Sequence, residues 1–318
     1  MSVHAFIFPG QGSQVVGMGQ ALAEAFPAAR EVFEEVDESL GQRLSQLIFE
    51  GPPEELMLTR NAQPALMAVS LAVIRVLERE AGLSIREKVR AVAGHSLGEY
   101  SALVAAGSLT LADAARLLRQ RGEAMQQAVA PGEGGMAALL GVELEGARSI
   151  CEAAADGPLG RQVVAPANDN GGGQIVISGA TDAVERAIEI ARTRGVRRAI
   201  RLVVSAPFHC SLMQPAAEKM AGVLERAAIA TPAVAVVANV TASEVAKPDE
   251  IRTQLVRQIT GLVRWRESML AIAAMGVESF VEIGAGKVLT GLVRRIVPDA
   301  EARAVGAPPE IESLVKVL

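Results

Sequence analysis

Short apolar runs alternate with longer stretches of helical periodicity along most of the chain. Residues 3–8 and 89–93 have the length and character of buried strands, and Pro9-Gly10 ends the first of them. The spacing of apolar positions predicts helices near 20–38, 62–80, 97–107 and 110–129. Beyond residue 203 it predicts helices at 211–228, 250–260, 265–275 and 287–297, strands at 233–238 and 278–283, and a final strand–helix pair. This alternation predicts an α/β protein with a parallel sheet.

The middle of the chain has a different order of elements. After a glycine-rich stretch at 131–135, the pattern predicts a strand (136–141), a helix (143–154), two strands (162–167, 174–179), a helix (181–194) and a strand (196–202). This βαββαβ succession is the ferredoxin-like arrangement, and its length suits a compact inserted unit. We therefore predict a ferredoxin-like subdomain at 131–202, inserted into a catalytic domain formed by 1–130 and 203–318.

The composition limits the classes of protein and the cellular locations that are possible for this chain. Half of the residues are apolar, so a large core can form, and the net charge of −5 is spread without long runs of one sign, which disfavours nucleic-acid binding. Two widely spaced cysteines argue against a disulfide framework or a metal cluster. The chain shows no secretory signal pattern, and its apolar runs are shorter than the ~18 residues that cross a bilayer. We expect a cytoplasmic protein without a membrane partner or a bound metal.

The segment Gly94-His-Ser-Leu-Gly98 directly follows a predicted strand and directly precedes a predicted helix. G-x-S-x-G in this context is the elbow that presents a nucleophilic serine above the edge of a sheet. The amides at the start of the following helix can then stabilise the negative charge formed when a carbonyl is attacked. A glycine-bounded turn without chemistry is the alternative interpretation, and the flanking strand and helix argue against it.

A nucleophilic serine needs a base, and the chain has only three histidines. His4 lies on the first strand, and the side chain of His95 should diverge from that of its neighbour Ser96. His209, in a turn before a helix, is therefore the candidate base. No aspartate after Ser96 stands out as the acid of a triad, so a Ser–His dyad oriented by a neutral carbonyl remains an alternative.

Arg121 lies within the apolar stripe of the helix at 110–129, three residues after Leu118 and four before Met125. A buried guanidinium must reach solvent or meet an anion, because an unpaired buried charge is costly. One alternative is an internal salt bridge to Asp or Glu. The other is a bidentate clamp for a substrate carboxylate, which would select dicarboxylic acyl groups such as malonyl.

Five motifs in this order resemble a known family. They are Phe8-Pro-Gly-Gln-Gly12, Gly94-His-Ser-Leu-Gly-Glu-Tyr100, Gln120-Arg-Gly122, Phe208-His209 and Val256-Arg-Gln258. Together they closely resemble malonyl-CoA:acyl carrier protein transacylases of bacterial fatty acid synthesis, and also the acyltransferase domains of polyketide synthases. The likeness covers nearly the whole chain, through Gly284-Ala-Gly-Lys-Val288, and implies an α/β-hydrolase-like core.

The resemblance implies a role for each matched position. Ser96 is the expected nucleophile, His209 its base, and Gln258 the residue whose carbonyl orients the far nitrogen of His209. Arg121 is expected to bind the malonate carboxylate. The other residues expected at the substrate site are Gln11 and Leu97, whose amides would form the oxyanion hole, and His95, Phe208, Asn168 and Asn170.

The implied reaction moves a malonyl group from malonyl-CoA, through a malonyl-serine, to the phosphopantetheine thiol of acyl carrier protein. One thioester replaces another, so no cofactor is expected, and the family implies a monomer. Three alternatives remain: an α/β serine hydrolase, a carrier-binding scaffold with a vestigial site, and an acyltransferase that serves a polyketide pathway.

Overall fold

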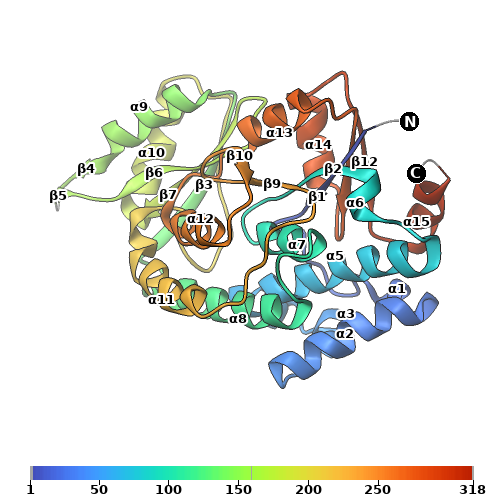
Figure 1. Cartoon of the computed structure of the whole chain (residues 1–318). Helices are drawn as coiled ribbons and strands as arrows, with labels where there is room; N and C mark the ends of the chain where they lie inside the picture. The colour runs from blue at the N-terminus through green and yellow to red at the C-terminus, as the bar shows by residue number, and fades with distance from the viewer. Residues whose placement is uncertain (1–2, 159, 317–318) are drawn as a thin grey trace.

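The computed structural model describes residues 3–158 and 160–316, which form two main sheets and one two-stranded hairpin, with helices packed around them (Figure 1). The larger sheet has six strands in the order β10-β9-β2-β1-β11-β12. Its neighbours β9, β2, β1, β11 and β12 are parallel, and β10 is antiparallel to β9. The strands are β1 (His4–Phe8), β2 (Val89–Gly94), β9 (Ala235–Ala238), β10 (Ser243–Val245), β11 (Ser279–Ile283) and β12 (Glu301–Val305).

Helices cover both faces of this sheet, because the side chains of β1 point alternately to one face and to the other. Phe6 and Phe8 join a large core with the helices of one face, whereas Ala5 and Ile7 join a second core on the other. Successive side chains of a strand point to opposite faces, so a strand buried on both sides is apolar throughout. The helices of the larger core are chiefly α2 (Pro27–Leu40), α5 (Thr59–Ala81), α7 (Gly98–Ala105), α8 (Leu111–Gln127), α11 (Gln214–Glu225) and α12 (Pro248–Thr260); those of the second are α13 (Trp265–Ala274) and α14 (Val288–Ile296).

The smaller sheet is antiparallel and has the order β6-β7-β3-β8. This is the ferredoxin-like order that the sequence predicts. Its elements are β3 (Gly134–Leu140), α9 (Leu144–Ala155), β6 (Val164–Asp169), β7 (Gln174–Ala180), α10 (Thr181–Thr193) and β8 (Arg198–Arg201). The two helices pack on one face around Leu139 and Ile177, while Met136 and Val176 join the larger core from the other face.

The predicted fold class is confirmed, but several elements differ in detail. The predicted helix 20–38 is two helices, α1 (Gln20–Ala25) and α2, because Phe26 is extended (φ −128°, ψ 118°) before Pro27. The residue before a proline is disfavoured in the helical region, so Pro27 already indicated a break between two helices. The helix predicted at 211–228 starts with the 3₁₀ turn η1 (Ser211–Met213) and ends at Glu225. Elements not predicted are α3 (Leu44–Glu50), α4 (Pro53–Met57), α6 (Ile85–Lys88), β10, and the hairpin of β4 (Asp156–Gly157) and β5 (Gly160–Arg161); β12 and α15 (Pro308–Val315) form the predicted final pair.

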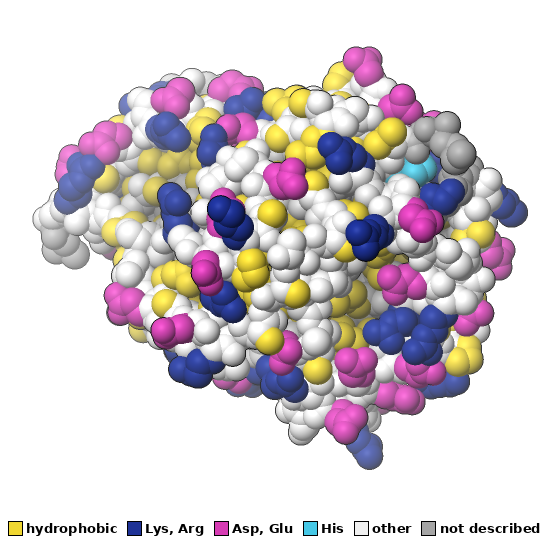
Figure 2. Space-filling view, in the orientation of Figure 1, with side chains coloured by type: hydrophobic (Ala, Val, Ile, Leu, Met, Phe, Trp, Pro, Cys, Tyr) yellow, Lys and Arg dark blue, Asp and Glu magenta, His cyan; other side chains and the backbone are white. Residues whose placement is uncertain are grey.

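The surface carries no dominant charge on the face shown in Figure 2, where basic and acidic side chains are interspersed. Within the described ranges, no helix is both long enough and apolar enough to cross a membrane.

Candidate active site

The turn after β2 presents Ser96 in a left-handed backbone conformation, with φ of 54°. The glycines on either side make this turn possible. A Cβ on Gly94 would lie 1.8 Å from the backbone of Gly98, and a Cβ on Gly98 would lie 2.4 Å from the carbonyl oxygen of Phe8. The elbow therefore depends on close backbone contact between β1, β2 and the start of α7, which only glycine allows at these two positions.

His209 lies against this serine, although 113 residues separate them in sequence. The Oγ of Ser96 is 2.8 Å from Nε2 of His209, and Nδ1 of His209 is 2.8 Å from the main-chain carbonyl oxygen of Gln258. A carbonyl oxygen only accepts, so Nδ1 carries the proton and Nε2 is free to accept the serine proton. This is the arrangement of a Ser–His dyad oriented by a neutral carbonyl.

His209 is only 3% exposed, and its protonation state follows from that burial. Burial, together with the smaller effect of the nearby positive charge of Arg121, lowers the pKa of His209 to about 3. The imidazole is therefore neutral at pH 7, which a general base requires.

Arg121 is 1% exposed and points its guanidinium at the nucleophile. Nη2 donates to Ser96 Oγ at 3.2 Å and to Gln258 Oε1 at 2.9 Å, and Nη1 donates to Gln63 Oε1 at 2.7 Å. None of the ion pairs among the described residues includes Arg121, which excludes the internal salt bridge, and Nε has no partner there. Neutral oxygens hold the group in place and leave its charge uncompensated by a direct anionic contact.

Gly122 brings this arginine close to the site. A Cβ there would lie 2.6 Å from the Cα of Arg60 and 2.7 Å from the carbonyl oxygen of Thr59. Helix α8 can therefore pack directly on the first turn of α5, from which Gln63 reaches Arg121. The side chain of Gln11 is held at the same place by a 3.2 Å hydrogen bond to Thr59 Oγ1.

A polar network beneath the elbow was not predicted from the sequence. The side chain of Asn239, after β9, accepts from the Ser96 amide at 2.7 Å and donates to the Gly94 carbonyl at 2.8 Å. The carboxylate of Glu99 accepts from the amide of Asn239 and from Nε2 of Gln258, both at 2.9 Å. These buried groups tie β9, α7 and α12 to the turn that holds the nucleophile.

A cavity of about 490 Å³ opens above Ser96. Most of the predicted site residues line it: Gln11, His95, Ser96, Leu97, Arg121, Asn168, Phe208 and His209. Gln258 lies beneath it and is fully buried, and Asn170 is a partner of His95 rather than a lining residue, with Nε2 of His95 3.0 Å from Asn170 Oδ1. The centroid of the His95 ring also lies 5.3 Å from that of Trp265.

The amides of Gln11 and Leu97 are free to bind an oxyanion. Gln11 follows β1 and Leu97 is the N-cap residue of α7, so both lie at the carboxyl edge of the larger sheet. Neither amide donates a hydrogen bond within the described part of the protein. An N–H at a helix start without an acceptor is available to stabilise developing negative charge.

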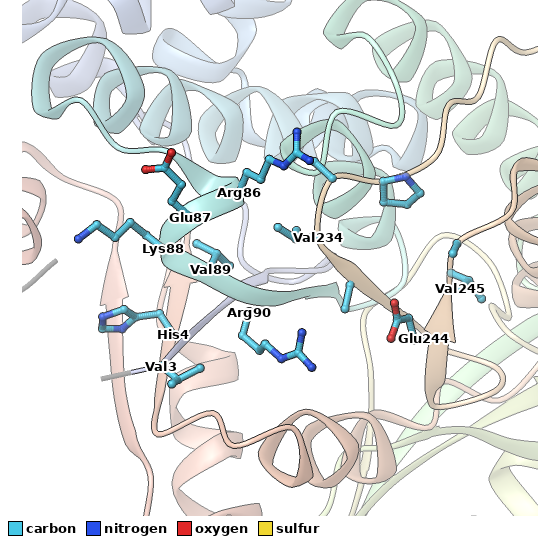
Figure 3. A pocket seen from close by; sticks show the side chains of 14 residues that line it. Val3, His4, Arg86, Glu87, Lys88, Val89, Arg90, Val234, Glu244 and Val245 are labelled. Carbon is cyan, nitrogen blue, oxygen red and sulfur yellow. The ribbon is translucent and has the colours of Figure 1, made fainter. Parts of the chain in front are cut away.

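A second cavity, of about 550 Å³, lies at the opposite end of the same strands (Figure 3). Charged side chains surround it, including Arg86, Arg90 and Glu244, but its lining contains no serine, threonine or cysteine. His4 is at this end, which confirms that it cannot serve Ser96, and burial lowers its pKa. Among the described residues, no group of His, Cys, Asp and Glu side chains is placed to hold a metal ion.

The geometry around Ser96 defines a site for serine-dependent acyl transfer, and comparison with known proteins places the chain in a family. A model of the acyl transferase domain matches residues 5–308, so the chain belongs to the acyl transferase domain family. A malonyl CoA-acyl carrier protein transacylase of Bacillus subtilis is 47% identical over 318 residues, covering 100% of this chain and 98% of that protein.

Two solved structures extend the comparison. An acyl-carrier-protein S-malonyltransferase of Bartonella henselae is 56% identical, with a TM-score of 0.95 and 99% of each chain covered. A malonyl-transacylase in complex with its holo type II PKS acyl-carrier protein is 43% identical, with a TM-score of 0.95 and both chains covered fully. The resemblance inferred from the five motifs is thus confirmed.

Proposed function

We propose that this chain transfers the malonyl group of malonyl-CoA to the phosphopantetheine thiol of an acyl carrier protein. One observation supports the choice of acyl group above all. Arg121 lies 3.2 Å from the Ser96 Oγ and is buried without a carboxylate partner among the described residues. An acyl group on Ser96 would carry a carboxylate into hydrogen-bond range of this guanidinium only if it were short and dicarboxylic, and a bidentate ion pair would then form.

The first half-reaction follows from the positions of the side chains. Ser96 Oγ attacks the thioester carbon while its proton passes to Nε2 of His209. The amides of Gln11 and Leu97 hold the oxyanion of the tetrahedral intermediate. When it collapses, the C–S bond breaks, the CoA sulfur takes the proton from His209, and malonyl-Ser96 remains.

The second half-reaction is the same chemistry in reverse, with the carrier thiol as the nucleophile. His209 takes its proton, the thiolate attacks the ester carbonyl, and Ser96 leaves with the proton restored. CoA and the carrier share a pantetheine arm, so one channel can serve both. One thioester replaces another, so the proposed reaction needs no ATP, metal or redox cofactor.

The transacylase structure solved with its acyl-carrier protein supports such a partner here. Leu202 and Val203 line the cavity at its rim, and Val203 is 88% exposed. Arg201 directly precedes them and forms an ion pair with Glu185. A carrier protein with acidic residues near the serine that bears its phosphopantetheine would meet the positive charge of Arg201 at this rim. A cytoplasmic, monomeric enzyme, as the family resemblance implies, remains part of this proposal.

Intact-mass spectrometry after brief mixing with malonyl-CoA tests the proposal. The native protein should gain the mass of one malonyl group, and Ser96→Ala should gain none. Adding a holo carrier protein should move that mass to the carrier. If water removes the adduct as fast as the carrier does, the chain is a hydrolase, which is the alternative that the shared elbow leaves.

A further inference from the structure

Glu99 is a buried carboxylate that the proposed reaction does not use. It is 2% exposed, lies in the first turn of α7 three residues after Ser96, and does not line the cavity. It forms no ion pair with the described residues; its Oε2 accepts from the Asn239 amide and from Gln258 Nε2. Burial of a carboxylate costs free energy, so a carboxylate at this position indicates a role for its two hydrogen bonds.

The side-chain amide of Gln258 separates this carboxylate from Arg121. Its Oε1 accepts from Arg121 Nη2 at 2.9 Å, and its Nε2 donates to the Ser96 carbonyl at 3.0 Å and to Glu99 Oε2 at 2.9 Å. The oxygen of the amide therefore acts as an acceptor and its nitrogen as a donor. Only the oxygen can hold the guanidinium, which has no acceptor, and only the nitrogen can satisfy the two oxygens on the other side.

We propose that Glu99 is a positioning residue for the carboxylate clamp: by accepting from Gln258 Nε2, it fixes the amide with its oxygen toward Arg121. In the flipped amide, the NH₂ group would face the N–H groups of Arg121. The amide oxygen would then face the Ser96 carbonyl and the Glu99 carboxylate. Both contacts would be repulsive, so the Glu99 acceptor, together with the Ser96 carbonyl, specifies one orientation. The guanidinium of Arg121 stays directed at Ser96 because its acceptor, Gln258 Oε1, is held in one orientation.

The inference rests on the proposed function, and its test compares two acyl donors. Malonyl acylation of Ser96 depends on Arg121, whereas acetyl acylation uses only the serine, its base and the oxyanion amides. Initial rates of Ser96 acylation from malonyl-CoA and acetyl-CoA, measured by quenched intact-mass spectrometry, give a malonyl-to-acetyl ratio. A loss of folding or of nucleophile geometry lowers both rates and leaves this ratio unchanged.

Three variants carry the test. Glu99→Ala removes the acceptor and should lower the ratio about tenfold, the scale expected when buried donors lose their partner. Glu99→Gln retains an amide oxygen that can accept from Gln258 Nε2 and should stay within about threefold of the native ratio. Glu282→Gln is the matched control: Glu282 is equally buried, but its carboxylate accepts from Leu289 and Thr290 of α14. Its ratio should equal the native one.

Two outcomes would overturn the inference. A native ratio in Glu99→Ala would show that Glu99 does not position the clamp, and an equal loss in Glu99→Gln would show that its acceptor is not what matters. The proposed function fails separately, if the native protein takes no malonyl group from malonyl-CoA.

Discussion

The main-chain carbonyl of Gln258, and not its side chain, accepts the hydrogen bond from His209 Nδ1. The side chain of the same residue serves Arg121 instead. One residue of α12 thus supports both the base and the proposed carboxylate clamp, through different atoms. Because side-chain substitution leaves the carbonyl in place, the two roles can be separated by mutation.

Gln258→Ala should therefore damage malonyl acylation far more than acetyl acylation. His209 keeps its carbonyl partner, whereas Arg121 Nη2 loses an acceptor worth about 1–3 kcal/mol in a buried site, or about 5- to 150-fold in rate. Initial acylation rates from the two CoA esters measure the effect. Gln254→Ala, on the same helix one turn earlier, is the control and should leave both rates unchanged. Equal losses with both donors would mean that the side chain supports the base.

Arg121→Ala should lower malonyl acylation of Ser96 by at least about 100-fold, because the malonate carboxylate would be buried without its partner. Acetyl acylation should survive, since the dyad and the oxyanion amides remain. Arg121→Lys should also be impaired, because a lysine ammonium lacks the planar fork that binds a carboxylate through two hydrogen bonds. Adduct mass with each donor measures both effects. Parallel losses with malonyl-CoA and acetyl-CoA would make Arg121 a structural residue.

The proposed catalytic residues were predictable from local patterns, whereas most of the residues that hold them in place were not; Gln258 was expected only through the family resemblance. Ser96 has a local motif, His209 followed by elimination among three histidines, and Arg121 interrupts an apolar stripe. Asn239 and Glu99, in contrast, meet across 140 residues of sequence, and no local pattern marks such a contact. Gln63 is likewise an ordinary polar position in α5 until α8 packs against it.

Local rules also explain where the fold prediction succeeded. Strands buried on both faces, such as β1, are continuous apolar runs, so their existence and boundaries followed closely from the sequence. The short helix α4 spans only Pro53–Met57, too few residues for helical periodicity to show. Its position depends on packing against α5, which is a tertiary effect.

Phe208→Ser should widen the acyl specificity. Phe208 is 8% exposed, lines the cavity and directly precedes His209, so its ring should crowd a branch at the α-carbon of the acyl group. Removing the ring should raise methylmalonyl acylation relative to malonyl acylation by about tenfold, the lower end of the scale for one methylene group in a pocket. Competition between malonyl-CoA and methylmalonyl-CoA, read by adduct mass, checks this. An unchanged ratio would show that Phe208 does not set the choice.

Gly98→Ala should destabilise the fold as well as the elbow. Its Cβ would lie 2.4 Å from the Phe8 carbonyl oxygen, a backbone atom of a central strand that cannot move aside cheaply. We expect a loss of about 1–3 kcal/mol in the free energy of unfolding. Gly222→Ala is the matched control, because Gly222 lies within α11 with open space around it and should gain about 0.5–1 kcal/mol. Urea unfolding of both variants decides the point, and a stable Gly98→Ala protein would contradict the close contact.

The pH dependence of stability should reveal Glu99. Burial raises the pKa of Glu99 from its ordinary 4.5 to about 7. The folded state therefore binds more protons than the unfolded state between these values, so its stability falls as pH rises from about 4.5 to 7 and is level above. At about 1.4 kcal/mol per pKa unit, the loss is about 3 kcal/mol at most.

His209 has the opposite effect, because its lowered pKa makes the folded state lose stability as pH falls from about 6.5 toward 3. Comparing the native protein with Glu99→Gln removes this contribution, since both contain His209. Between pH 5 and pH 8, the free energy of unfolding of the native protein should fall relative to that of the variant, because only the native protein must then bury a negative charge beneath Ser96. Parallel curves for the two proteins would mean that Glu99 titrates near its ordinary value and that the polar network fully offsets the cost of its burial.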